Sequence, residues 1–92
     1  MAIDSLRQQT LTAAAQCVLK DRNDAYGSVE DNFNNIAKLW GAYKDVQFTA
    51  VDVAMMMSLM KIARIKHNPT HFDSFVDLAG YAACGAEAGN GK

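Results

Sequence analysis

Residues 51–65, V-D-V-A-M-M-M-S-L-M-K-I-A-R-I, constrain the fold more than any other part of the chain. Apolar side chains occupy almost every side of a helix drawn through this segment. Such a helix is either central to a helical bundle or buried between subunits. Asn68 and Pro69 end it, because proline disfavours a helical conformation in the preceding residue. Thr49 followed three residues later by Asp52 predicts a capping box at its start.

Three further segments also have helical patterns, and no segment reads as a strand. Ser28 is a predicted N-cap with Glu30 and Asp31 in the first turn of its helix, and Asp4 or Ser5 can cap an earlier helix. Thr70 is the expected cap of the last helix, with Asp73 in its first turn. The sequence predicts an all-α, antiparallel four-helix bundle, with helices over about 4–21, 29–43, 50–66 and 71–88, in a single helical domain that spans 1–92.

In two of these helices, apolar residues indicate which side packs against the rest of the protein. Along 29–43 they form one stripe at helical spacing. Along 71–88 an apolar side is accompanied by a second side that carries carboxylates and small residues. The stripe of 29–43 comprises Val29, Phe33, Ile36, Trp40 and Tyr43. The apolar side of 71–88 comprises Phe72, Phe75, Val76, Ala79, Ala83 and Ala86. The side with carboxylates and small residues comprises Asp73, Asp77, Gly80 and Cys84.

Size and charge narrow the functional classes. A chain of 92 residues buries only roughly 60–65% of its unfolded surface, so we expect a homo-oligomer. A net charge of -1 without basic runs gives no extended nucleic-acid surface and no attraction to anionic membranes. No apolar stretch reaches the roughly 20 residues of a membrane span. Cys17 and Cys84 lack metal-type or redox-type spacing, so we expect two buried thiols in a cytoplasmic protein.

Lys61 and Arg64 come near the end of one helix, and Asp73 and Asp77 open the next. Unpaired charges cost several kcal/mol to bury, so these groups meet each other, solvent or a charged ligand. An internal salt bridge that fixes the helix register is one interpretation. The alternative is a site at which Lys61 and Arg64 contact phosphates.

Asp73 and Asp77 lie one turn apart on the same side of a helix, and Glu30 is a third acid that could join them. Carboxylate oxygens are the ligands that Mg²⁺ prefers, so these three residues are the candidate magnesium ligands. The simpler alternative is that Asp73 and Glu30 only stabilise the first turns of their helices.

Two other places could contact a ligand. Arg22, Tyr26 and Gly27 belong to a charged, aromatic loop, which either lines a pocket mouth or is an ordinary turn. Tyr81 follows Gly80, a helical glycine that suggests close approach of a backbone or a ligand. Tyr26 and Tyr81 are candidates for contact with a nucleobase.

The segments R-N-D-A-Y-G, D-N-F-N-N-I-A-K-L-W, D-V-A-M-M-M-S-L-M-K-I-A-R and D-S-F-V-D-L-A-G-Y-A-A together resemble a small phage and prophage domain without an assigned activity. The resemblance covers about residues 20–86. More distantly, the chain resembles phage nucleotide-modification-associated domains, and through them the MazG-like all-α nucleoside triphosphate pyrophosphohydrolases. That distant resemblance implies magnesium-dependent hydrolysis of nucleotides and, for a phage-encoded protein, a place in the host cell cytoplasm.

The chain departs from the MazG-like pattern at its carboxylates. Glu30 and Asp31 are adjacent instead of being separated by a turn, and Asp73 and Asp77 are spaced by four residues instead of three. We therefore expect a phage-type protein that binds a nucleotide or related phosphorylated molecule, and the departures leave open whether it also hydrolyses that molecule. The alternatives are a non-catalytic accessory protein, which sequesters a signalling nucleotide or inhibits a host defence protein, and an inert oligomeric module.

Overall fold

The computed structural model describes residues 5–21 and 28–90, with the backbone alone at positions 20, 21 and 30. Within these ranges the chain is all-α, as predicted. The helix ends agree with the predicted ranges to within two residues, with one exception. The exception is the end of the first predicted helix, where the geometry changes from α-helical to π-helical. They are α1 (Leu6–Gln16), the π-helical η1 (Cys17–Asp21), α3 (Val29–Lys44), α4 (Ala50–His67) and α5 (Phe72–Gly89).

The predicted caps are confirmed at three of the four helix starts. The hydroxyls of Ser5 and Ser28 accept hydrogen bonds from backbone N–H groups three residues later, each at 3.1 Å. Thr49 and Asp52 form a reciprocal capping box, with bonds of 3.1 and 2.8 Å. Each of these side chains satisfies a backbone N–H group that the helix itself leaves without a partner.

The predicted cap of α5 is wrong. His71, and not Thr70, occupies the N-cap position, and no side chain caps the helix there. The Thr70 hydroxyl lies 3.3 Å from the Asn68 side-chain oxygen instead, because Pro69 and Thr70 form the turn that precedes the helix. The ring of His71 contacts the hydroxyl of Ser74 at 2.9 Å.

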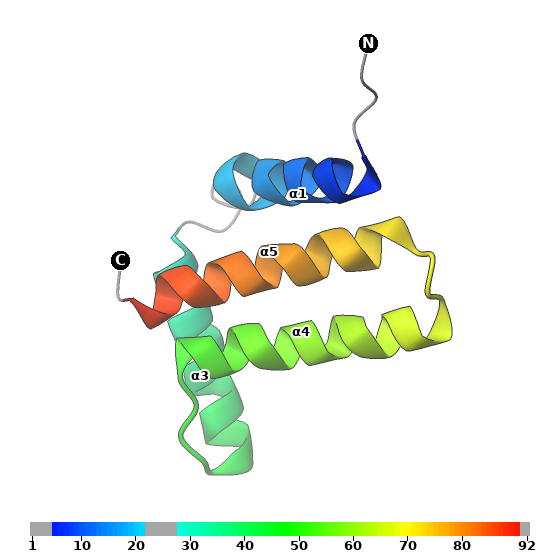
Figure 1. The fold of residues 1–92 in the computed structure, drawn as a ribbon. Coiled ribbons are helices and arrows are strands. Elements are labelled where there is room, and N and C mark those ends of the chain that lie inside the picture. The colour runs from blue at the N-terminus through cyan, green and yellow to red at the C-terminus, as the bar shows by residue number, and fades with distance from the viewer. Residues whose placement is uncertain (1–4, 22–27, 91–92) are drawn as a thin grey trace.

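The helices form a layer of three with α3 lying across it (Figure 1). α4 and α5 run side by side in opposite directions, as expected for an antiparallel pair. α1 lies along the other side of α5 but runs in the same direction as α5, so the prediction of antiparallel neighbours is wrong for this pair. The reason is that α3, which links α1 to α4 in the chain, crosses the layer near the start of α4 instead of lying within it.

The core lies where α3 meets α4 and α5. Val53 and Ala54 of α4 are fully buried, and Phe33 of α3 is 2% exposed. The predicted stripe of α3 packs here as far as Trp40, whose ring meets that of Phe48 edge to face at a centroid distance of 6.2 Å. The stripe ends there, because Tyr43 in the last turn is 88% exposed.

α5 buries Gly80 and Cys84 of its side of small residues, and of its predicted apolar side it buries Val76. Gly80 and Gly85 are buried, whereas Phe72 and Phe75 are exposed. A Cβ at Gly80 would lie 3.0 Å from Val18 Cγ1, and one at Gly85 would lie 3.1 Å from Ala54 Cβ. The absence of side chains at these positions lets α5 approach η1 on one side and α4 on the other. The close approach suspected at Gly80 is therefore confirmed, with a neighbouring helix as its partner.

The two cysteines differ in accessibility. Cys84 is buried, as predicted, but Cys17 is exposed in η1. None of the helices in the described part of the chain has the length and apolar character that crossing a bilayer requires.

Candidate functional site

Lys61 and Asp77 form an ion pair between α4 and α5, with Lys61 Nζ 2.8 Å from Asp77 Oδ2. The side chain of Lys61 is 14% exposed and that of Asp77 is 43% exposed. Lys61 is therefore the partner whose charge is withdrawn from water, and Asp77 supplies the compensating charge. The internal salt bridge is confirmed for these two residues.

Arg64 and Asp73 lie outside this ion pair. Arg64 is exposed near the end of α4, and in the described part of the chain it forms no salt bridge. Asp73 is exposed in the first turn of α5. The four charged residues thus separate into one closed pair and two exposed single charges, and they do not converge on one cavity.

Arg64 lines a hollow of about 470 Å³ beside the turn that joins α4 to α5. His67 and His71 line the same hollow, which brings one guanidinium and two imidazoles to one place. His71 Nδ1 lies 2.9 Å from the buried Ser74 hydroxyl, a contact that restrains the ring and does not involve Nε2. Sequence analysis did not select the histidines, because the turn at Asn68 and Pro69 lies between them and they therefore lack the spacing of a metal-binding pair on one continuous helix. The hollow is also lined by Met60, Ala63, Asn68 and Ser74.

Tyr81 and Asp77 line a separate hollow of about 190 Å³ between η1 and α5. This volume is below the roughly 300 Å³ at which small-molecule pockets begin. Cys17 and Cys84 also border it, from opposite elements. The hollow is large enough for solvent or for the edge of a ligand, but not for a whole nucleotide.

The described carboxylates do not form a ready magnesium site. Asp77 is held by the ammonium group of Lys61, and Asp73, one turn earlier on α5, is exposed. Among the residues that the structure describes, no three histidine, cysteine, aspartate or glutamate side chains are grouped to hold a metal ion. The side chain of Glu30 lies outside the described residues, so its place in a magnesium site stays a prediction.

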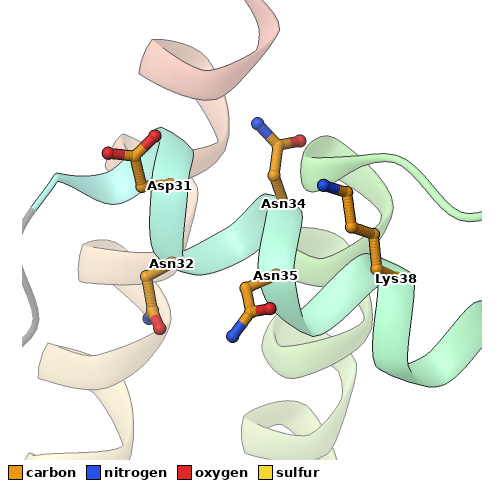
Figure 2. Close-up of a pocket in the computed structure, with 5 residues that line it drawn as sticks. All are labelled: Asp31, Asn32, Asn34, Asn35 and Lys38. Carbon is orange, nitrogen blue, oxygen red and sulfur yellow. The ribbon is translucent and has the colours of Figure 1, made fainter.

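α3 carries a polar hollow of about 510 Å³ on its outer side (Figure 2). Figure 2 shows Asp31 and Asn34 on one side of the helix and Asn32 and Asn35 on the other, with Lys38 extending towards Asn34. These side chains diverge, so they form a hydrated surface and not a pocket with convergent groups.

Arg22 and Tyr26, the predicted ligand contacts of the loop before α3, lie outside the described residues. Their part in a site stays a prediction.

The fold and these hollows define a small all-α protein in which one arginine and two histidines line a hollow at a helix–helix turn. Comparison with known families places it more narrowly. The model for "Domain of unknown function (DUF6378)" matches residues 9–89, and the chain belongs to this family.

The curated relatives are phage proteins. The chain is 51% identical over 73 residues to the "Gene 55 protein" of Mycobacterium phage L5, which covers 78% of this chain and 47% of that protein. It is 42% identical over 79 residues to the "Gene 55 protein" of Mycobacterium phage D29, which covers 86% of this chain and 52% of that protein. The chain thus spans about half the length of the curated relatives that it matches. No solved structure matches it.

Proposed function

We propose that this protein binds a nucleotide or a related phosphorylated small molecule in the hollow beside the α4–α5 turn. The observation that carries the proposal is Arg64, an exposed arginine without an acidic partner in the described part of the chain, which lines this hollow with His67 and His71. A guanidinium presents paired N–H donors that match two phosphate oxygens, and neighbouring imidazoles add further donors. The volume of about 470 Å³ lies within the range of small-molecule sites.

Binding, and not hydrolysis, is the primary activity in this proposal. Lys61, the other cation first assigned to phosphates, is engaged by Asp77 at 2.8 Å. A Mg²⁺ ion at Asp77 would have to displace that lysine, which adds an energetic cost to metal binding. Magnesium-dependent pyrophosphohydrolysis, with Glu30, Asp73 and Asp77 as ligands, is therefore a second step that needs its own test.

The relatives favour a role for such binding in phage infection. The similar proteins from phages L5 and D29 are named only as gene products, so the role that we propose is general. A protein that binds a signalling nucleotide without cleaving it would act as a sequestering, anti-defence factor in the host cytoplasm.

The test is calorimetric titration of the purified chain with ribonucleoside and deoxyribonucleoside mono-, di- and triphosphates, and with inorganic pyrophosphate, with and without Mg²⁺. We expect at least one phosphorylated ligand to bind, and Arg64→Ala to weaken that binding by about tenfold or more, as the loss of a charge-assisted hydrogen bond predicts. Arg7→Ala is the matched control, because Arg7 is an exposed arginine that lines a different hollow. If no member of the panel binds to a folded sample, or if both variants bind equally well, the proposal is wrong.

Product analysis separates the two activities. Release of pyrophosphate from a bound triphosphate indicates hydrolysis, and binding without release indicates sequestration. Lys61→Met frees Asp77, so if Asp77 is a magnesium ligand this change should raise the affinity for Mg²⁺.

A further inference from the structure

One side of α4 is apolar and partly exposed; at its edge the methyl end of Met55 also reaches α5, 3.1 Å from where a Cβ at Gly85 would lie. The exposed fractions of Met55, Met56, Leu59 and Ile62 are 43, 41, 62 and 48%, and Ala63 is exposed beside them. We call these five residues the α4 face. In the part of the chain that the structure describes, the other helices that contact α4 are α3 and α5, and Figure 1 shows no helix along its remaining side. Contiguous exposed apolar residues are typical of surfaces at which proteins bind other molecules.

Two opposite charges lie at the two ends of this strip. Positions 52, 55, 59, 62 and 66 follow one another at intervals of three and four residues, the spacing of the seam in a coiled coil. Asp52 begins this line and Lys66 ends it, and both are exposed. They are separated by about 21 Å along the helix axis. Asp52 accepts from the backbone of Thr49 through Oδ2, which leaves Oδ1 for a second partner.

We propose that a second copy of this chain covers the α4 face, with the two α4 helices antiparallel and the two-fold axis beside Leu59. In this arrangement Leu59 meets its own copy at the centre. Met55 faces Ile62 of the partner subunit, and Met56 faces Ala63 of the partner subunit. Asp52 faces Lys66 of the partner subunit at both ends of the interface, as a two-fold axis requires.

Charge selects this arrangement over its alternatives. A parallel pair would place Asp52 against its own copy and Lys66 against its own copy, and each of these contacts is repulsive. An unrelated partner would have no need of an acid and a lysine at equal distances from Leu59. The placement of seven residues on either side of Leu59 is therefore a self-complementary pattern.

The expected association is moderate in strength. The strip is one helix wide and about 21 Å long, which is smaller than a standard interface of about 800 Å² per partner. We therefore expect a dimer that dissociates at concentrations of roughly 1–100 µM. The α4 face and the proposed ligand hollow share Ala63, but Arg64, on which the ligand proposal rests, is not part of the α4 face, so each proposal has its own test.

The first test is sedimentation of the full chain over a range of concentrations from about 1 to 500 µM, the window set by the expected strength of the interface. We expect the wild type to change from monomer to dimer, and Leu59→Glu to raise the dissociation constant by about a hundredfold or more. Leu39→Glu is the matched control, because Leu39 is 63% exposed on α3 and Leu59 is 62% exposed on α4. A wild type that stays monomeric throughout, or a dimer that only Leu39→Glu disrupts, would overturn the inference.

The second test measures the orientation and does not need a variant that disrupts the dimer. On a Cys17→Ser background, chains with Met55→Cys are mixed with chains with Ile62→Cys under mild oxidation. The antiparallel pair predicts a disulfide-linked heterodimer and little linkage of Met55→Cys to itself, since the two Met55 positions are about 12 Å apart along the axis. Linkage of Met55→Cys to itself, with little linkage to Ile62→Cys, indicates parallel helices. The absence of both kinds of linkage indicates that the chains associate through another surface. Each of these two outcomes contradicts the inference.

Discussion

At the scale of single residues, the ion pair between Lys61 and Asp77 is the interaction whose loss has the clearest consequence. Removing the charge of Asp77 leaves the ammonium of Lys61, only 14% exposed, without a compensating anion. Because Asp77 itself is 43% exposed, we place the effect between those of surface and buried pairs. Asp77→Asn should lower the free energy of unfolding by about 1–3 kcal/mol in urea titrations.

Two variants serve as controls for this prediction. Lys61→Met should cost less than Asp77→Asn, because the half-exposed carboxylate that remains can be hydrated. Asp73→Asn should change stability by less than about 0.5 kcal/mol, since Asp73 is exposed on the same helix and outside the pair. Equal losses for Asp77→Asn and Asp73→Asn would show that the pair contributes nothing specific.

Gly85 gives a second prediction at this scale. Alanine is favoured over glycine in a helix by about 1 kcal/mol. At Gly85, however, the added methyl would lie 3.1 Å from Cβ of Ala54, a fully buried residue that cannot move without the backbone. Overpacking of about 1–3 kcal/mol therefore outweighs the gain, and Gly85→Ala should lower the melting temperature. Gly89→Ala should leave it unchanged or higher, because Gly89 is exposed in the last turn of α5 and a shift of a few tenths of an ångström relieves its 3.3 Å contact with Val51 Cγ2.

At the scale of helices, the two capping threonines predicted from the sequence should respond differently to substitution. Thr49→Ala removes one half of a capping box and should cost about 1 kcal/mol of unfolding free energy. Thr70→Ala should cost less than about 0.5 kcal/mol, because Thr70 lies in the turn before α5 and does not cap it. The same denaturant titration measures both variants, and equal losses would contradict the assignment of His71 as the N-cap.

Helix starts and ends could be predicted because their causes are local. Ser28 and Thr49 precede their helices directly, and Pro69 acts on the residue beside it. The buried side of α5 could not be predicted in this way. Phe72 and Phe75 are more apolar than Gly80 and Gly85, but the fold buries the glycines because the close approach of η1 and α4 requires small residues at these positions. Apolar periodicity shows which side chains favour burial, but it does not show how much space the neighbouring helices leave for them.

The candidate site was predictable in part for the same reason. Lys61 and Asp77 meet because the α4–α5 hairpin fixes their register. The tight turn at Pro69 made that hairpin predictable from the sequence. Arg64 lies on another side of α4, so it joins His67 and His71 instead of the ion pair. The spacing of Lys61 and Arg64 alone placed them one turn apart, but it did not reveal which neighbours each would meet.

At the scale of the whole molecule, the α4 face links stability to concentration. A dimer that binds only the folded state stabilises it by mass action, so the melting temperature should rise with protein concentration. For a chain of 92 residues, 1 kcal/mol corresponds to about 4–8 °C. We therefore expect the wild type to melt roughly 5 °C higher at about 200 µM than at about 2 µM in differential scanning calorimetry. Leu59→Glu should melt at one temperature across this range, because a glutamate at the two-fold axis prevents the two apolar strips from meeting. A wild type whose melting temperature does not change with concentration would mean that α4 gains no stability from a second copy, and its exposed methionines, leucine and isoleucine would then have to be explained without self-association.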